Sequence, residues 1–314
     1  MQAHKILAAL IAFSALSGCL STVGDTVSRA GDTPDLRFEA PPGMQRLMSP
    51  APHNFRRGLV GAGDPVRRGR VSERYELREG DCGGSDCAQP RARAELQMRA
   101  EANPARIGED IWYGWSFYNA TVPAFRKENA LRLVFGQWTM GGTNKPIFRF
   151  IQLGKGETSF AGCDPKVCNT RDPSKGDLVV QLEDIAAARG WGDAQNEGYV
   201  CRLFDLEDRR GQWTDIMVNT NFSTGDDGYL RIWVDQKMVC NYAGPLVSAQ
   251  SAAAGTTPGH RRGIYSSWTK RWTKSQGDRR RPSLIVYYDE FRTGTRMSDV
   301  DVRQARAADL PPVD

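Results

Sequence analysis

Hydrophobic and polar positions alternate over many short stretches of this chain, and this alternation predicts β-strands. The stretches are rich in β-branched and aromatic side chains, and clusters of glycine and aspartate such as residues 224–228 separate them. No long segment has a helical period, and residues 185–188 predict one helical turn at most. The predicted strands are residues 113–118, 132–135, 146–153, 178–182, 199–204, 213–219, 228–234 and 284–291.

So many short strands in a chain of 314 residues predict an all-β fold, a jelly-roll (concanavalin-like) sandwich of two sheets. Such sandwiches often bend so that one sheet presents a concave face, across which a long polymer can lie. The sequence has no internal repeat and no shift in composition that would mark a second domain. We predict one β domain over residues 53–306 and a disordered tail over residues 307–314.

The N-terminal segment has the features of an export signal. A lysine precedes an apolar stretch over residues 6–16, which is too short to span a bilayer. The motif Leu16-Ser17-Gly18-Cys19 then matches a bacterial lipobox, which predicts cleavage before the cysteine and attachment of lipid to Cys19. The alternative is an ordinary signal peptide followed by a chance cysteine.

The lipobox also predicts a location. Leu20 follows the cysteine, where retention in the bacterial inner membrane usually requires aspartate, so we predict the outer membrane of a bacterial cell envelope. Residues 1–18 are the predicted signal peptide, and residues 19–52, rich in Ser, Thr, Gly, Asp and Pro, are a predicted lipidated tether without fixed structure. The lipid is then the only predicted contact with the membrane, because no later segment is long and apolar enough to cross it.

The cysteines predict disulfides. An exported domain lies in an oxidising compartment, and the six cysteines beyond Cys19 fall into three groups of two. The pairs predicted from proximity are Cys82–Cys87, Cys163–Cys168 and Cys201–Cys240. The alternative is a zinc site built from the first two pairs, although the spacing is loose for zinc and no histidine is near.

The run Arg261-Arg262-Gly263-Ile264-Tyr265 carries candidate chemistry. Alternation along a strand places Arg261, Gly263 and Tyr265 on one face. A cation beside a phenol is suited to removing a proton from the carbon next to a carboxylate. The alternative is that Tyr265 is a half-buried strand tyrosine.

A second polar run is Arg93-Ala94-Glu95-Leu96-Gln97. Arg91, Arg93, Glu95 and Gln97 would share a face, and a guanidinium group binds a carboxylate through two parallel hydrogen bonds. The alternative is an ordinary strand with a solvated, charged face.

These runs, with Gly136-Gln137-Trp138-Thr139 and the segment 227–235, resemble the heparin-lyase-I-like polysaccharide lyases over about residues 91–302. That group shares a β-jelly-roll architecture with the alginate and glucuronan lyases. The run over residues 93–97 is similar to their Arg-(Ser/Thr)-Glu-(Leu/Val)-Arg strand, and the run over residues 136–139 is similar to their Gln-x-His strand. The run ending at Tyr265 is similar to Lys-x-Gly-(Ile/Leu/Val)-Tyr, with Arg261 in the lysine place.

The resemblance implies roles for individual residues. Tyr265 would transfer the proton, with Arg261 neutralising the substrate carboxylate or lowering the pKa of the tyrosine. Arg93 would face that carboxylate, held in place by the structural residue Glu95, and Gln137 would help to bind it.

Thr139 departs from the family pattern, because it stands where the resemblance places a histidine base. Three alternatives follow. His260 or another group is the base, or Tyr265 makes both proton transfers, or the chain binds carbohydrate without cleaving it.

Charge favours an acidic polymer as the partner. The net charge is +5, and between residues 260 and 281 Asp278 is the one acid among many basic residues. The alternative is a basic surface loop that touches anionic lipopolysaccharide. The residues predicted to bind substrate are Arg91, Gln97, Trp138, Arg262 and Trp268.

These features predict a polysaccharide lyase that cleaves a uronate-containing acidic polysaccharide by β-elimination on a concave carbohydrate-binding face. The alternative is a non-catalytic carbohydrate-binding lipoprotein on the same fold. We expect no required cofactor, no nucleic-acid partner and a monomer. Structural calcium is an open option at two acidic segments, Asp226-Asp227-Gly228 and Asp289-Glu290.

Overall fold

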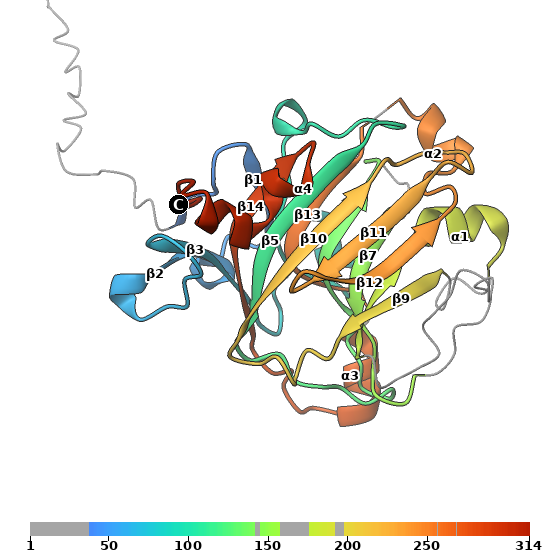
Figure 1. The fold of residues 1–314 in the computed structure, drawn as a ribbon. Helices are drawn as coiled ribbons and strands as arrows, with labels where there is room; N and C mark the ends of the chain where they lie inside the picture. The colour runs from blue at the N-terminus through green and yellow to red at the C-terminus, as the bar shows by residue number, and fades with distance from the viewer. Residues whose placement is uncertain (1–37, 142–144, 158–175, 192–197, 256, 268) are drawn as a thin grey trace, which may run out of the picture. The chain divides into compact units, whose positions relative to one another are not determined.

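The structure, a computed structural model, describes residues 38–141, 145–157, 176–191, 198–255, 257–267 and 269–314. Within it, two antiparallel sheets of seven strands each face one another (Figure 1). The first sheet has the order β1 (Met44–Met48), β4 (Ala92–Met98), β13 (Gly259–Ser266), β6 (Leu133–Thr139), β7 (Pro146–Gln152), β8 (Leu178–Gln181) and β9 (Tyr199–Phe204). The second has the order β12 (Lys237–Ala243), β11 (Tyr229–Val234), β10 (Trp213–Thr220), β5 (Ile111–Asn119), β14 (Leu284–Gly294), β3 (Val71–Leu77) and β2 (Phe55–Leu59). The predicted two-sheet β-sandwich is confirmed.

The helices are short; most lie in the connections between strands, and the last two follow β14. The α-helices are α1 (Glu183–Arg189), α2 (Ala249–Ala253), α3 (Thr269–Gln276), α4 (Met297–Val300) and α5 (Val302–Ala307). The 3-10 helices are η2 (Pro52–Asn54), η3 (Val60–Ala62), η4 (Gly84–Ala88) and η5 (Ala100–Ala102). Among the described residues, no helix has the length and apolar character needed to cross a membrane.

The core lies between the sheets because each strand sends alternate side chains inward. On β4, Ala92, Ala94 and Leu96 are buried in the core. The polar residues between them point away from the core, on the opposite face of the sheet. On β5 of the second sheet, Trp115 and Phe117 are among the aromatic residues that pack inward. We call the face of the first sheet that is directed away from the core its outer face.

Two of the predicted disulfides are present. Cys201 of β9 and Cys240 of β12 form a disulfide that joins edge strands of the two sheets. Cys82 and Cys87 close the loop that contains η4 and precedes β4. The predicted Cys163–Cys168 pair and the lipidated Cys19 lie outside the described residues.

The folded region extends further at both ends than the sequence predicted. β1 pairs with β4 along its whole length, so the part of the predicted tether that contains Met44–Met48 is an edge strand of the first sheet. At the C-terminus, the Val313 backbone NH donates to Glu290 Oε1 at 2.8 Å, and Asp314 Oδ1 accepts from the backbone NH of Arg70 at 2.9 Å. The predicted disorder of residues 307–314 is therefore wrong, because the tail has partners on β14 and next to β3.

Candidate active site

The outer face of three adjacent strands brings together most of the polar residues that the sequence singled out. β13 lies between β4 and β6, with Tyr265 opposite Arg93 and Arg261 opposite both Gln97 and Gln137. Because alternate residues share a face, Arg93, Glu95 and Gln97 of β4 and Arg261 and Tyr265 of β13 lie on this outer face. The structure therefore brings these five residues and Gln137 together on three adjacent strands.

Glu95 connects Arg93 and Gln137 within this group. Its side chain is fully buried, and its carboxylate accepts hydrogen bonds from Arg93 Nη1 at 2.5 Å and Gln137 Nε2 at 2.7 Å. Arg93 also donates through Nε to Asp86 Oδ2 of η4 at 2.6 Å. Two carboxylates therefore fix the direction of one guanidinium group, which agrees with the structural role expected for Glu95.

Tyr265 lies against that guanidinium group. The Cζ atom of Arg93 is 4.1 Å from the centre of the tyrosine ring, a cation–π contact, and the residue is 7% exposed. Among the described residues, the Tyr265 hydroxyl has no hydrogen-bond partner. The phenol oxygen is thus not committed to another group of the described protein.

Burial raises the pKa of Tyr265, although the guanidinium groups of Arg93, Arg91 and Arg149 act in the opposite direction. An apolar cluster on the same outer face, which includes Val134 and Ile151, surrounds the ring. The expectation that nearby guanidinium groups lower this pKa is therefore wrong in its net direction, because desolvation outweighs them.

Arg261 is held less tightly than Arg93. Its Nε donates to Gln97 Oε1 at 3.0 Å, and its Nη groups make no hydrogen bond within the described part of the chain. Burial lowers the pKa of Arg261, and the Glu95 carboxylate opposes that shift. The two terminal nitrogen atoms of Arg261 are therefore free to bind an anion on the outer face.

Two functional candidates were missed in the sequence. Arg149 of β7 stands opposite Gln137 and donates to Gln181 Oε1 at 2.8 Å, and its Nη2 lies 3.0 Å from Glu183 Oε2. Asp86, the partner of Arg93, was the second. Arg149 had a local signal, since it is a single cation between two phenylalanines on a predicted strand, but its partners come from distant segments.

Comparison with known families identifies the chain. A family model described as polysaccharide lyase matches residues 57–292. The chain belongs to this polysaccharide lyase family. None of the curated proteins matches it.

Solved structures with a similar fold include other lyases. The endo-β-1,4-glucuronan lyase from the fungus Trichoderma reesei is 16% identical, with a TM-score of 0.47 over 75% of this chain and 86% of that chain. The alginate lyase AlgAT5 from polysaccharide lyase family 7 is 11% identical, with a TM-score of 0.45 over 77% of this chain and 82% of that chain. An alginate lyase from Corynebacterium sp. is 9% identical, with a TM-score of 0.40 over 71% and 76%. At these values the likeness is one of general fold.

Three residues predicted for the site of this lyase lie on the other face of the sheet. His260 is 1% exposed, and its ring is stacked on Phe291 with 4.7 Å between ring centres. Burial lowers the pKa of His260 well below its ordinary value, and Arg262 adds to the shift. Trp138 is fully buried in the same aromatic core. His260 as a base and Trp138 as a substrate-binding residue are therefore wrong, because neighbours of outward residues on a strand point inward.

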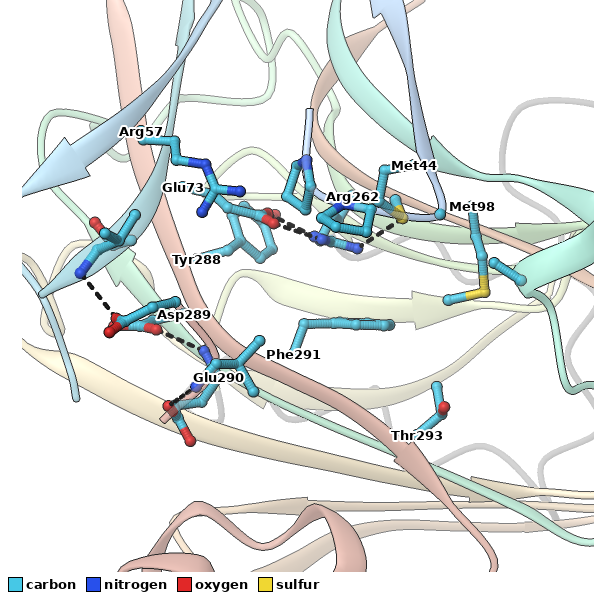
Figure 2. A pocket seen from close by; sticks show the side chains of 18 residues that line it. Met44, Arg57, Glu73, Met98, Arg262, Tyr288, Asp289, Glu290, Phe291 and Thr293 are labelled. Carbon is cyan, nitrogen blue, oxygen red and sulfur yellow. Dashed lines mark hydrogen bonds and ion pairs between the residues drawn. The ribbon is translucent and has the colours of Figure 1, made fainter. Parts of the chain in front are cut away.

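Arg262 is the third misplaced residue. Its guanidinium group donates to both carboxylate oxygens of Glu73 on β3, at 2.6 and 2.5 Å, and the residue is 3% exposed. The pair lines a cavity of about 400 Å³. Figure 2 shows it together with Met44 and Met98, which line the same cavity. Arg262 therefore connects the first sheet to the second and does not bind substrate on the outer face.

The remaining predicted residues are more peripheral. Arg91 is exposed and lies 3.8 Å from Asp86, just before β4, and Trp268 lies outside the described residues. Thr139 is at the end of β6, opposite Gly259.

Both acidic segments considered for calcium have other partners. Asp227 Oδ1 accepts a hydrogen bond from Ser223 Oγ, and Glu290 lies 3.0 Å from Arg68 and 2.9 Å from Arg292. In the part of the chain that the structure describes, no group of three or more His, Cys, Asp or Glu side chains could hold a metal ion.

Proposed function

We propose that this lyase cleaves a uronate-containing acidic polysaccharide by β-elimination, with Tyr265 as the proton-transfer residue, as in the heparin-lyase-I-like group. One observation carries the proposal. Tyr265, with an uncommitted hydroxyl, lies on the same outer face as Arg261, whose terminal nitrogen atoms have no partner among the described residues. A base and a carboxylate-binding cation are two of the groups that this reaction requires.

The chemistry follows from the substrate. The proton at C5 of a uronate is weakly acidic, and its removal places negative charge on the adjacent carboxylate. Arg261 and Gln137 would stabilise this charge directly, and preorganised donors of this kind are usually the largest catalytic contribution. Elimination then breaks the bond between C4 and the glycosidic oxygen, which departs with a proton that the Tyr265 hydroxyl can return, and leaves a C4–C5 double bond without a hydrolytic water.

Arg93 supports this reaction in two ways. Its bonds to Asp86 and Glu95 use three of its five N–H donors and leave two for a substrate carboxylate. Its guanidinium group also lies against the Tyr265 ring, where a positive charge favours the phenolate. The two carboxylates keep it in that position.

The test is a measurement of ultraviolet absorbance by the unsaturated product while the lyase is incubated with a panel of uronate polysaccharides. We expect a rise with at least one polymer, and a loss of more than about 100-fold in rate in Tyr265→Phe. Tyr229→Phe, on β11 of the second sheet, is the matched control and should retain activity. Activity that survives in Tyr265→Phe would contradict the assigned role. A flat trace with every polymer, together with retained binding, would favour the carbohydrate-binding alternative.

We also propose that the lyase is a lipoprotein of the bacterial outer membrane. The lipobox ending at Cys19 supports this, as do the Cys82–Cys87 and Cys201–Cys240 disulfides, which form in oxidising compartments. Incorporation of labelled palmitate that disappears in Cys19→Ala would confirm the anchor. Labelling that persists in this variant would disprove it.

A further inference from the structure

We propose that this lyase has a second binding site, for a phosphate group, on the outside of its second sheet. The site is a cavity of about 280 Å³ between the segment that precedes β3 and helix α5. Four of the five residues that line it are arginines: Arg67, Arg68, Val302, Arg303 and Arg306. Tyr265 belongs to the first sheet, so the inference does not depend on the proposed reaction.

A row of polar residues on the second sheet anchors this site. Asp215 of β10 and Asp289 of β14 both stand opposite Ser116 of β5. The chain neighbours of Ser116, Trp115 and Phe117, point into the core. The row therefore lies on the face of the second sheet that is directed away from the core.

Asp215 holds one arginine from each side of the cavity. Its Oδ1 accepts from Arg67 Nε at 3.1 Å, and its Oδ2 accepts from Arg67 Nη2 at 2.9 Å and from Arg303 Nε at 3.4 Å. Asp289 holds the backbone of the first segment, since its Oδ2 accepts from the NH groups of Arg67 at 2.6 Å and Arg68 at 3.3 Å. Both aspartates are buried. The arginines are therefore fixed in place before a ligand binds, which lowers the entropy cost of binding.

Positive charge exceeds negative charge at the cavity. Four guanidinium groups line it, and the described residues supply three carboxylates that pair with any of them: Asp215, Asp235 and Glu290. Glu290 is shared with Arg292, and Asp235 is shared with Arg209, so neither carboxylate balances the cavity alone. An anion can therefore bind there without displacing these ion pairs.

Arg306 is the arginine that is most available to a ligand. Its side chain is exposed, and among the described residues its guanidinium group has no hydrogen bond or ion pair. Arg67 Nη1 and Arg303 Nη1 also make no hydrogen bond within the described part of the chain. The cavity thus offers N–H donors from both of its sides.

These donors suit a phosphate group. A guanidinium group presents parallel N–H donors that match phosphate oxygen atoms, and a phosphate monoester carries a charge of about −1.5 to −2 at neutral pH. A uronate carboxylate or a sulfate ester carries a single charge. Among the described residues no aromatic ring lines the cavity, so a sugar ring has no surface on which to stack. Soluble phosphate compounds and lipid head groups both present the chemistry that the cavity would recognise.

Calorimetric titration with inorganic phosphate tests the site. The wild-type lyase, Arg306→Gln and Arg126→Gln are compared at constant ionic strength, with chloride in place of phosphate in the blank. Arg126 is exposed and its side chain has no partner among the described residues, so its replacement is a matched control for the loss of one charge. We expect saturable binding in the wild type and the control, and binding at least about 10-fold weaker in Arg306→Gln.

The Arg306→Gln variant should fold normally, because the side chain that it replaces is exposed and unpaired within the described residues. Its unfolding temperature without phosphate should therefore equal that of the wild type. Absence of saturable binding to the wild-type lyase would overturn the inference. Equal affinity of Arg306→Gln and Arg126→Gln for phosphate would overturn it as well.

Vesicles identify the source of the phosphate group. Binding to phosphatidylcholine vesicles, with and without phosphatidic acid, is measured in Cys19→Ala so that no lipid attached at this position contributes. Binding that requires phosphatidic acid and that Arg306→Gln weakens would identify a lipid head group. Binding of inorganic phosphate without vesicle binding would identify a soluble phosphate compound. Vesicle binding that Arg306→Gln leaves unchanged would overturn a lipid ligand for this site.

Lyase kinetics distinguish this site from the proposed active site. Arg306→Gln should retain the wild-type kcat/KM on any uronate polymer that is cleaved, because the cavity lies on the second sheet and Tyr265 on the first. A selective loss of kcat/KM would show that these arginines bind the substrate and would overturn a separate phosphate site. If no polymer is cleaved, the proposed function fails, and the phosphate titration still decides this inference.

Discussion

Arg261 and Arg262 are neighbours on β13 whose side chains leave the strand on opposite faces. Arg261 has one hydrogen bond, to the amide of Gln97, whereas Arg262 is buried and shares two with the carboxylate of Glu73. The first is available to a ligand, and the second balances a buried charge. We therefore propose separate roles for these identical side chains one position apart, one in binding and one in stability.

Substitution of each arginine by glutamine should separate these roles. Arg261→Gln should lower kcat/KM by about 100-fold or more with little change in the free energy of unfolding, because one charge-stabilising donor group is lost. Arg262→Gln should lower the free energy of unfolding by about 3–5 kcal/mol, because Glu73 is left without its buried partner. Urea unfolding and steady-state kinetics measure the two effects. A stable Arg262→Gln variant with a selective loss of kcat/KM would contradict the assignment.

The role proposed for Tyr265 predicts the pH dependence of the reaction. In that role the base is the phenolate, and burial raises the pKa of this phenol above its ordinary value of about 10. The reactive fraction therefore grows as the pH rises, and kcat/KM should increase from neutral pH into the alkaline range without a falling limb there. A profile of kcat/KM against pH tests this. A bell-shaped profile with a maximum near neutral pH would point to a second titrating group.

At the scale of elements, Gly263 shapes the strand that carries Tyr265. The pairing of β13 with β6 shifts between Arg262 and Tyr265, which is a β-bulge. Gly263 has a φ of 130°, and a Cβ atom there would lie 2.2 Å from the Ala94 carbonyl oxygen. Tyr288 of β14 donates from its hydroxyl to the Gly263 carbonyl oxygen at 3.0 Å. The bulge therefore requires glycine and is tied to the second sheet.

Alanine at Gly263 should be costly. Gly263→Ala should lower the free energy of unfolding by about 2 kcal/mol or more, since both the backbone conformation and the close approach to β4 disfavour a side chain. Gly136→Ala on the adjacent strand is the matched control, because a Cβ there would be 3.9 Å from its nearest neighbour. Thermal and urea unfolding of both variants provide the comparison. Equal stability of the two variants would show that the bulge tolerates a side chain.

At the scale of the whole described domain, the two disulfides close loops of different length. The Cys201–Cys240 disulfide spans 39 positions and joins the two sheets, whereas Cys82–Cys87 spans 5 and closes a single loop. A cross-link restricts the unfolded chain more when the loop that it closes is longer. The first bond should therefore contribute more to stability than the second.

Replacement of each cysteine pair by alanine tests this difference. Loss of Cys201–Cys240 should lower the free energy of unfolding by about 4 kcal/mol, and loss of Cys82–Cys87 by about 2 kcal/mol. The midpoints of urea unfolding under non-reducing conditions measure both. A larger loss for the short loop would mean that it stabilises chiefly through η4, where Asp86 holds Arg93.

The sequence by itself determined the fold class and the residues of one face. Alternation has a period of two, set by the backbone alone, so Arg93, Glu95 and Gln97 could be grouped, as could Arg261 and Tyr265. The same rule places His260 and Arg262 on the opposite face with the apolar Ile264, but their chemical types favoured a functional interpretation. Each run that carries the family resemblance is a short continuous segment of the chain, so the sequence alone was enough to recognise it.

Only the tertiary structure decided which partners those residues have and what their surroundings do. Asp86 reaches Arg93 because η4 packs against β4, and Glu73 reaches Arg262 across a contact that depends on the order of strands in two sheets. The pKa of Tyr265 rises because the whole fold removes water from its ring, a sum over distant segments that no local pattern contains. Sequence alternation predicts on which face of the sheet a side chain lies. The order of the strands and the burial of that face decide which groups the side chain contacts.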